Sequence, residues 1–268
     1  GGGVRYSGAS AALTNFAESA GIPVAATQAG KSVMPEAHPN YVGSLGVTGS
    51  SAANDLAEKA DVVLSVGSRL QDFTTGSNGL IKGQVLSLNV QLHDAIKHDA
   101  ITVVGDALVG LETLGHALVG HHTSDAYQQE YATLKREWDA AVDTVTGKPE
   151  GNALPSDSAV IGAVNRNVPA TAIAVGAAGS MPGELHKLWR TGAVDGYHME
   201  YGFSCMGYEV SAGIGVHMAS PDRPNVVFAG DGSYLMMNSE LATAVMMGVS
   251  MTLVVTDNRG YGCINRLQ

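Results

Sequence analysis

The hydrophobic and polar positions of this chain follow two alternating periods. Short, β-branched apolar runs predict buried parallel strands at residues 22–27, 61–66, 84–89, 101–105, 171–175, 225–229 and 251–256. Segments with a helical period lie between them and predict helices at residues 9–20, 50–60, 107–119, 125–145, 157–167, 208–219 and 238–248. Strands and helices that alternate at this spacing predict an α/β protein with doubly wound parallel sheets.

Two doubly wound domains joined by a helical linker are expected. Residues 1–120 are predicted to form a central Rossmann-like domain, residues 121–153 the linker and residues 154–268 a second domain. The linker helix carries a stripe of large apolar residues at helical spacing, which is typical of packing: Tyr127, Tyr131, Leu134, Trp138 and Val142.

Several connecting segments are expected to lack regular structure. Residues 30–49 contain two prolines, residues 72–79 are rich in threonine and glycine, and residues 198–207 are of mixed polarity. We expect all three to be loops. The sequence Gly-Asp-Gly at residues 230–232 is expected to be a turn that precedes the helix at 238–248.

Two polar turns follow neighbouring strands of the second domain. The sequence Gly-Asp-Gly-Ser at 230–233 follows the strand at 225–229, and Asp-Asn at 257–258 follows the strand at 251–256. With the helix between them, these strands form a βαβ unit. Both turns therefore fall at the carboxyl edge of the parallel sheet, where ligands bind.

The residue types in these turns suit a metal ion and a phosphate group. Asp231 offers a carboxylate oxygen, Asn258 an amide oxygen and Gly260 a backbone carbonyl. Such hard oxygen ligands are typical of Mg²⁺ bound beside a phosphate. Three neighbouring residues would let backbone N–H groups approach an anion: Gly230, Gly232 and Ser233.

The spacing of the two turns closely resembles the diphosphate motif of thiamine-diphosphate-dependent enzymes, Gly-Asp-Gly followed by Asn-Asn, with Asp257 in place of the first Asn. The resemblance implies thiamine diphosphate and Mg²⁺ as cofactors, with Asp231, Asn258 and the backbone oxygen of Gly260 as metal ligands. The competing interpretation is an incidental turn in a doubly wound sheet.

The first domain resembles the central domain of the acetohydroxyacid synthase-like group of these enzymes. The sequences that carry the resemblance are GIPVAATQAGKSVMPEAHP, EKADVVLSVGSRLQDFTTG and DAIKHDAITVVGDA. In some relatives this domain holds FAD or another nucleotide, and in others it is only structural. For Gly67 and Arg69, a nucleotide contact and a plain turn with a surface arginine both remain open.

The second domain resembles the domain that binds the cofactor diphosphate. By this resemblance, Gly179 and Ser180 approach the phosphates, and backbone groups near Ser204 face the aminopyrimidine ring. Met206 stands where relatives place the large apolar residue that bends the cofactor into a V shape. The alternative for Met206 is a core methionine.

A narrower resemblance points to the hydrolases of this superfamily that act in myo-inositol catabolism. It is carried by YHMEYGFSCMGYE, GDGSYLMMNSELATA and DNRGYGCINRLQ. The resemblance implies hydrolytic C–C cleavage of a cyclic 1,2-diketone, from trihydroxycyclohexane-1,2-dione to 5-deoxyglucuronate. His198, Tyr201 and Tyr234 are candidates to bind this small polyhydroxylated substrate, although a structural hydrogen bond is an equal alternative for each.

Three other functions compete with this interpretation. One is a carboligase acting on 2-oxo acids, as in acetohydroxyacid synthase, and another is a non-catalytic nucleotide-binding domain. A nicotinamide-dependent oxidoreductase has less support, because no GxGxxG sequence follows a strand with an acidic residue about 20 positions further on.

The family's catalytic glutamate is not expected in this chain. In the family it comes from the N-terminal domain, usually of a neighbouring subunit. Both ends of the chain resemble interior points of a longer protein, because a glycine turn opens it without a preceding strand and its last strand lacks covering helices. We therefore expect the chain alone to be inactive and the full-length protein to be a homo-oligomer. Glu200, Glu209 and Glu240 are expected to be surface or helix-capping acids.

Composition narrows the classes of partner and location. The formal charge of −10 argues against nucleic acid as a partner. No apolar run is long enough for a membrane span, and no signal peptide opens the chain. Cys205 and Cys263 are predicted to be buried free thiols. These features favour a cytoplasmic protein.

Overall fold

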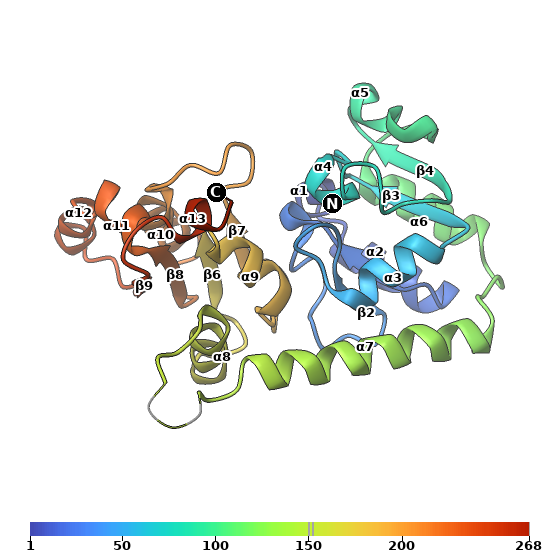
Figure 1. Ribbon diagram of the computed structural model, residues 1–268. Helices are drawn as coiled ribbons and strands as arrows, with labels where there is room; N and C mark the ends of the chain where they lie inside the picture. The colour runs from blue at the N-terminus through green and yellow to red at the C-terminus, as the bar shows by residue number, and fades with distance from the viewer. Residues whose placement is uncertain (150, 152, 268) are drawn as a thin grey trace. The chain divides into compact units, whose positions relative to one another are not determined.

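The computed structural model describes residues 1–149, 151 and 153–267. The chain divides into two compact units, one ending at Val142 and the next beginning at Asp143. The division falls inside the predicted linker, because most of its long helix packs with the first unit. Figure 1 shows the elements of both units in chain order.

The first unit alternates short strands and helices. Its elements are α1 (Gly2–Tyr6), α2 (Ser10–Ala20), β1 (Val24–Ala26), the 3-10 turn η1 (Gln28–Gly30), β2 (Tyr41–Ser44), α3 (Ser51–Lys59), β3 (Val62–Val66), α4 (Asp72–Thr75), β4 (Gln84–Asn89), α5 (Leu92–Ala95), η2 (Lys97–Asp99), β5 (Ile101–Val104), α6 (Ala107–Ala117) and α7 (Asp125–Val145). Ser50 caps α3, because its Oγ accepts a hydrogen bond from the N–H of Ala53 at 3.1 Å.

All strand pairs of the first unit are parallel. β3, β4 and β5 form one sheet, and β1 pairs with β2 in another. Two predicted loops are wrong in part, since residues 30–49 contain β2 and residues 72–79 contain α4. Both elements span only four residues, too few to show a period in the sequence.

The stripe on α7 is a packing surface, as predicted. Tyr131 and Val142 are buried in this helix, while its charged face is exposed. Tyr131 packs in a cluster with Val42 of β2 and Leu56 of α3. Its hydroxyl also accepts a hydrogen bond from Asn40 Nδ2 at 3.2 Å, so the helix is joined to the β1–β2 region by both apolar and polar contacts.

The second unit is a four-stranded parallel sheet in the order β7-β6-β8-β9. Its elements are α8 (Asp157–Asn167), β6 (Ile173–Gly176), α9 (Met181–Leu188), β7 (Tyr197–Met199), α10 (Tyr208–Ala219), β8 (Asn225–Gly230), α11 (Asp231–Met237), α12 (Glu240–Met246), β9 (Thr252–Thr256) and α13 (Gly262–Leu267).

Helices cover both faces of this sheet, which confirms the doubly wound α/β fold (Figure 1). Val227 of β8 packs in a cluster with Ala212 of α10. The next residue, Phe228, points to the opposite face because side chains alternate along a strand, and its ring meets Trp189 after α9 edge-on, with centroids 5.6 Å apart. The site-bearing strand β8 is therefore anchored from both sides.

Two predictions about the second unit are wrong in detail, and one of its helices was missed. The predicted loop at 198–207 begins inside β7, and α9 was not predicted. The expected turn at 230–232 is instead the start of α11, with Gly230 as its N-cap residue. Two glycines around an aspartate are typical of turns, but here they occupy the first turn of a helix, where glycine costs little.

None of the described helices combines the length and apolar character needed to cross a lipid bilayer.

Candidate functional site at the carboxyl edge of the second sheet

The two polar segments, residues 230–233 at the start of α11 and residues 257–258 after β9, meet at the carboxyl edge, as predicted from the parallel βαβ unit. Gly230, the last residue of β8, pairs with Thr256, the last residue of β9. The loop after β9 then returns to the start of α11, where the N–H of Gly260 donates a hydrogen bond to Asp231 Oδ2 at 2.9 Å. The structure therefore brings Asp231 and Gly260 together.

The second carboxylate oxygen of Asp231 has an unusual environment. Its Oδ1 is buried, and no described group donates a hydrogen bond to it. Removing a carboxylate oxygen from water without a donor or a cation is unfavourable by several kcal/mol or more. Because Gly260 occupies Oδ2, the free oxygen is Oδ1, and it suits a cation such as Mg²⁺.

Asn258 lies in the same loop but is exposed. Its side-chain amide lies against Gly262, where an added Cβ would come within 2.9 Å of Nδ2. The described residues contain no group of three or more His, Cys, Asp or Glu side chains that could hold a metal ion. A site made of one carboxylate, one amide and one backbone carbonyl is not such a group, so the predicted ligand set is compatible with that finding.

The side chain of Asp257 stabilises the loop after β9. Its Oδ1 accepts a hydrogen bond from the N–H of Arg259 at 2.9 Å, and Arg259 adopts a left-handed φ of 60°. This is an Asx-type turn, which aspartate and asparagine both support through a side-chain oxygen. The difference from the Asn-Asn motif at this position therefore preserves the shape of the loop.

The glycines at this edge fall into two kinds. Among the residues that the structure describes, an added Cβ at Gly179 or Gly230 would meet no atom within 4 Å, so both residues border open space. At Gly232 an added Cβ would lie 2.8 Å from the ring of Tyr261. Gly230 and Gly179 therefore leave room for a ligand, whereas Gly232 makes room for a side chain of this chain.

Ser180 and Ser233 use their side chains within the protein. Ser180 Oγ donates a hydrogen bond to Asp157 Oδ2 at 3.2 Å, which ties the start of α9 to α8. Ser233 is 3 % exposed, and its Oγ lies 2.7 Å from Oε2 and 2.8 Å from Oε1 of Glu209. Only their backbone groups could face the phosphates.

The sequence predicts a surface or helix-capping acid at Glu209. The surface alternative is wrong, whereas the capping alternative is confirmed in part, because the carboxylate accepts a hydrogen bond from the N–H of Gly207, the N-cap residue of α10. Glu209 is 1 % exposed in the first turn of α10, and its carboxylate accepts hydrogen bonds from the N–H groups of Ala178 and Gly207 as well as from Ser233. Sequence reasoning missed the burial of Glu209 and its contacts with Ala178 and Ser233. The available signal was a lone acid in a mostly apolar helix, because an acid that is buried there needs hydrogen-bond partners.

The loop that carries Ser204 and Met206 is organised by Glu200. The Glu200 carboxylate accepts hydrogen bonds from the N–H of Phe203 at 2.9 Å and of Cys205 at 2.7 Å. Partial burial raises the pKa of the Glu200 carboxyl, but hydrogen bonds from the backbone N–H groups of residues 202–205 outweigh it and hold the pKa below its ordinary value.

The loop residues themselves are open to solvent. Ser204 has a left-handed φ of 52°, and Met206 is 36 % exposed, so Met206 is not a core methionine. Both cysteines are free, as predicted, but Cys205 is exposed rather than buried and Cys263 is only partly buried. The loop reverses direction around the Glu200 carboxylate, and its side chains are exposed. A count of apolar residues in the sequence does not reveal this exposure.

The three candidate substrate-binding residues lie in different settings. His198 is half-buried, and its Nε2 lies 2.8 Å from the hydroxyl of Tyr208, with the two rings stacked. Tyr201 and Tyr234 are also half-buried. His198 is thus held by a structural hydrogen bond and remains partly exposed.

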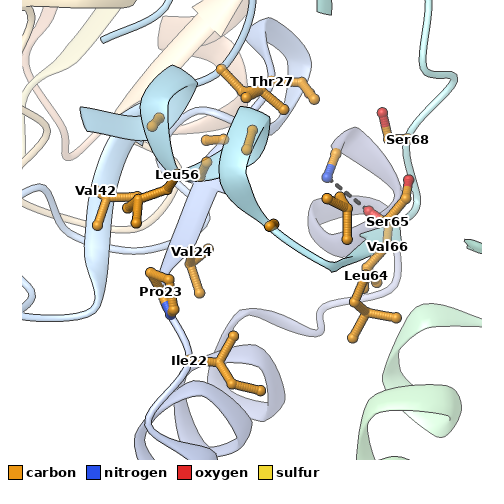
Figure 2. Close-up of a pocket in the computed structure, with 18 of the residues that line it drawn as sticks. Ile22, Pro23, Val24, Thr27, Val42, Leu56, Leu64, Ser65, Val66 and Ser68 are labelled. Atoms are coloured by element: carbon orange, nitrogen blue, oxygen red, sulfur yellow. Dashed lines mark hydrogen bonds between the residues drawn. The ribbon is translucent and has the colours of Figure 1, made fainter. Parts of the chain in front are cut away.

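The first unit contains an apolar cavity of about 190 Å³ (Figure 2). Figure 2 shows Val24, Val42, Leu56 and Leu64 around it, and no charged side chain is among the described residues that line it. The side chains of this lining offer a nucleotide phosphate no cation, and their polar groups are hydroxyls, those of Thr27, Ser65, Ser68 and Tyr127.

For Gly67 and Arg69, the two alternatives were a nucleotide contact and a plain turn with a surface arginine. Gly67 has φ +56°, and an added Cβ would lie 2.6 Å from Gly3 Cα, so its freedom serves a close backbone approach. Arg69 is exposed. The geometry is that of a turn with a surface arginine.

Comparison with known proteins identifies the class. The family described as the thiamine pyrophosphate enzyme central domain matches residues 1–114, and the C-terminal TPP binding domain of the same enzymes matches residues 177–268. The chain therefore belongs to the thiamine pyrophosphate enzymes and contains their central and cofactor-binding domains.

Individual relatives of the chain carry a narrower description than the two domain families. The chain is 41% identical over 293 residues to a 3D-(3,5/4)-trihydroxycyclohexane-1,2-dione hydrolase of Clostridium perfringens, and 41% identical over 291 residues to that of Geobacillus thermodenitrificans. The one of Clostridium tetani is 40% identical over 294 residues. Each match covers 100% of this chain but 46%, 45% and 46% of the three relatives in that order, so the chain spans about half the length of the curated relatives it matches.

Proposed function

We propose that the full-length protein is a thiamine-diphosphate- and Mg²⁺-dependent hydrolase of a cyclic 1,2-diketone. It would convert 3D-(3,5/4)-trihydroxycyclohexane-1,2-dione to 5-deoxyglucuronate in myo-inositol catabolism. The observation that carries the reaction is the 41% identity, across the whole chain, to relatives named for this substrate. The observation that supports the cofactor site is the buried Oδ1 of Asp231, which accepts no hydrogen bond from the described residues.

The residues present fit the cofactor. Asp231 Oδ1, the amide oxygen of Asn258 and the carbonyl of Gly260 would hold Mg²⁺, which also takes phosphate oxygens as ligands. The open space beside Gly179 and Gly230 would admit the diphosphate. When bound, thiamine diphosphate supplies the nucleophilic carbon and the electron sink for C–C cleavage.

The chain's own contribution is to bind and orient. The Glu200 hydrogen bonds fix the loop that carries Ser204 and Met206, so the exposed Met206 side chain can support the cofactor rings. His198 would meet hydroxyl groups of the substrate from the end of β7 while Tyr208 holds its ring. No residue of this chain is assigned the proton transfer on the cofactor.

Association of subunits and a cytoplasmic location are further parts of the proposal. Several large apolar side chains of α11 and α12 are exposed, including Leu235 at 67 %, Val245 at 80 % and Met246 at 87 %. An apolar patch of this kind is typical of a protein–protein contact and supports a homo-oligomer. The cytoplasmic location is a prediction from the sequence alone.

A binding titration tests the cofactor site. Thiamine diphosphate is titrated calorimetrically into the full-length protein with and without Mg²⁺, and the titration is repeated with Asp231→Asn. Asp222→Asn is the matched control, because Asp222 is exposed and lies before β8, at the other end of the strand.

We expect Mg²⁺-dependent binding in the wild type and in the control, and a loss of affinity of at least about tenfold in Asp231→Asn, which corresponds to about 1.4 kcal/mol. Equal affinity of Asp231→Asn and wild type would remove the metal-ligand assignment.

A further inference from the structure

Glu209 connects three backbone segments of the second unit that are far apart in the sequence. It lies in the first turn of α10. Its carboxylate contacts Ala178 in the loop between β6 and α9, Gly207 immediately before α10, and Ser233 in α11. The longest of these connections spans 31 residues of sequence.

The contacts form one hydrogen-bonded network. The N–H of Ala178 lies 3.4 Å from Oε1, and the N–H of Gly207 lies 3.1 Å from Oε2. Gly207 N–H also donates to Ser233 Oγ at 2.7 Å, and the Ser233 hydroxyl donates to the Glu209 carboxylate. The Ser233 hydroxyl thus links Gly207 to Glu209, because it accepts a hydrogen bond from the first and donates one to the second.

At the position of Glu209, the network requires a side chain that accepts hydrogen bonds and carries no donor. Every group that faces the Glu209 carboxylate in these contacts is a donor. A carboxylate accepts at both oxygens, whereas glutamine would present an NH₂ group to at least one N–H. Because Glu209 and Ser233 are 1 % and 3 % exposed, water cannot readily replace a lost partner.

Each connected segment adjoins a different part of the proposed cofactor site. Ala178 precedes Gly179, Gly207 follows Met206, and Ser233 belongs to the segment that contains Asp231. We propose that Glu209 is a positioning residue that holds these three segments in the arrangement needed to bind the cofactor diphosphate and rings. This inference rests on the proposed function, and it assigns Glu209 no contact with reacting atoms.

The physical basis is preorganisation. If the three segments were free to move apart, binding would have to order them, and that cost would be subtracted from the affinity. Gly207 shows how tightly they are held, since an added Cβ there would lie 2.8 Å from Met237 Cγ of α11. Loss of the carboxylate should therefore weaken cofactor binding more than it slows a fully loaded enzyme.

The test compares Glu209→Gln with a variant of another buried glutamate in the full-length protein. Glu36 of the first unit is 7 % exposed and forms an ion pair with the buried Lys31 at 3.3 Å. Glu36→Gln therefore controls for the general effect of neutralising a buried carboxylate. For each variant, the Kd of thiamine diphosphate with Mg²⁺ is measured by calorimetry, together with Tm and the kcat at saturating cofactor.

We expect Glu209→Gln to raise the Kd about tenfold while kcat at saturation stays within about threefold of wild type. Glu36→Gln should lower Tm without changing the Kd. An unchanged Kd for Glu209→Gln, with or without a lower Tm, would overturn the positioning role.

If Glu209→Gln does not fold, Ser233→Ala decides the question, because it removes the connecting hydroxyl from the same network. The expected result is a Kd raised about fivefold, and an unchanged Kd would overturn the proposal. A wild-type protein that fails to bind thiamine diphosphate would instead overturn the proposed function, together with this inference.

Discussion

Gly230 and Gly232 flank the same aspartate, yet the structure predicts different consequences for adding a methyl group at each. At Gly230 the backbone has φ −71° and ψ 157°, which alanine adopts easily, and no atom of the described chain lies within 4 Å of the new Cβ. At Gly232 the new Cβ would come within 2.8 Å of the Tyr261 ring.

The expected stability change of Gly230→Ala is small. Restricting the unfolded chain stabilises the protein by about 0.4–1 kcal/mol, and losing glycine at an N-cap destabilises it by a similar amount. The free energy of unfolding should therefore stay within about 1 kcal/mol of wild type. The methyl group would, however, enter the space proposed for the diphosphate and raise the cofactor Kd about tenfold or more.

Gly232→Ala, in contrast, should lower the free energy of unfolding. Its methyl group displaces the ring of Tyr261, which is 51 % exposed and can move, so we expect a loss of about 1 kcal/mol, at the low end of overpacking costs. Adding Tyr261→Ala should remove the clash and restore the stability lost to it.

Urea unfolding and calorimetric titration of thiamine diphosphate with Mg²⁺ measure the two effects separately. A cofactor Kd within about twofold of wild type in a folded Gly230→Ala protein would show that the diphosphate does not occupy this space. A destabilisation of Gly230→Ala by several kcal/mol would refute the conclusion that Gly230 borders open space.

Three further predictions concern packing, a hydrogen bond and pH. Gly213→Ala should destabilise the protein by about 1–3 kcal/mol in urea unfolding, because its Cβ would lie 2.5 Å from a methyl group of Val227; no destabilisation would mean that α10 packs less closely on β8. Tyr131→Phe should cost about 1 kcal/mol through the lost hydrogen bond from Asn40, with an unchanged cofactor Kd. The depressed pKa of Glu200 means that its stabilisation of the following loop is fully present above the unfolded value of 4.5 and is lost as pH falls through the folded pKa. Hydrogen-exchange protection of the loop amides should fall in that acidic range in the wild type and be low at all pH values in Glu200→Gln; equal protection in both proteins would contradict this role.

Long periodic elements were predictable from the sequence. The bounds of α7 and α8 match the predicted helices because each shows a helical repeat over more than ten residues. The bounds of α10 also match, although its residues are mostly apolar on all sides and show little repeat. β2 and β7 have only four and three residues, so tertiary pairing rather than local pattern determines them. α9 begins Met-Pro-Gly, which favours a turn unless the first helical turn tolerates both residues.

The candidate site was predictable only as far as topology determines it. The meeting of Asp231 and Gly260 follows from the rule that parallel strands end at one edge. The partners of Glu209 do not follow from any local pattern, because they come from three separate segments. The same holds for the ring of Tyr261 over Gly232, which depends on how the loop after β9 folds back.

The most direct test of the proposed function is a product assay. The full-length protein is incubated with thiamine diphosphate and Mg²⁺, with the cyclic diketone in one sample and pyruvate in another, and products are identified by NMR. We predict ring opening of the diketone to 5-deoxyglucuronate, and loss of that product in Asp231→Asn. Formation of acetolactate from pyruvate, with the diketone left intact, would contradict the proposed hydrolase activity.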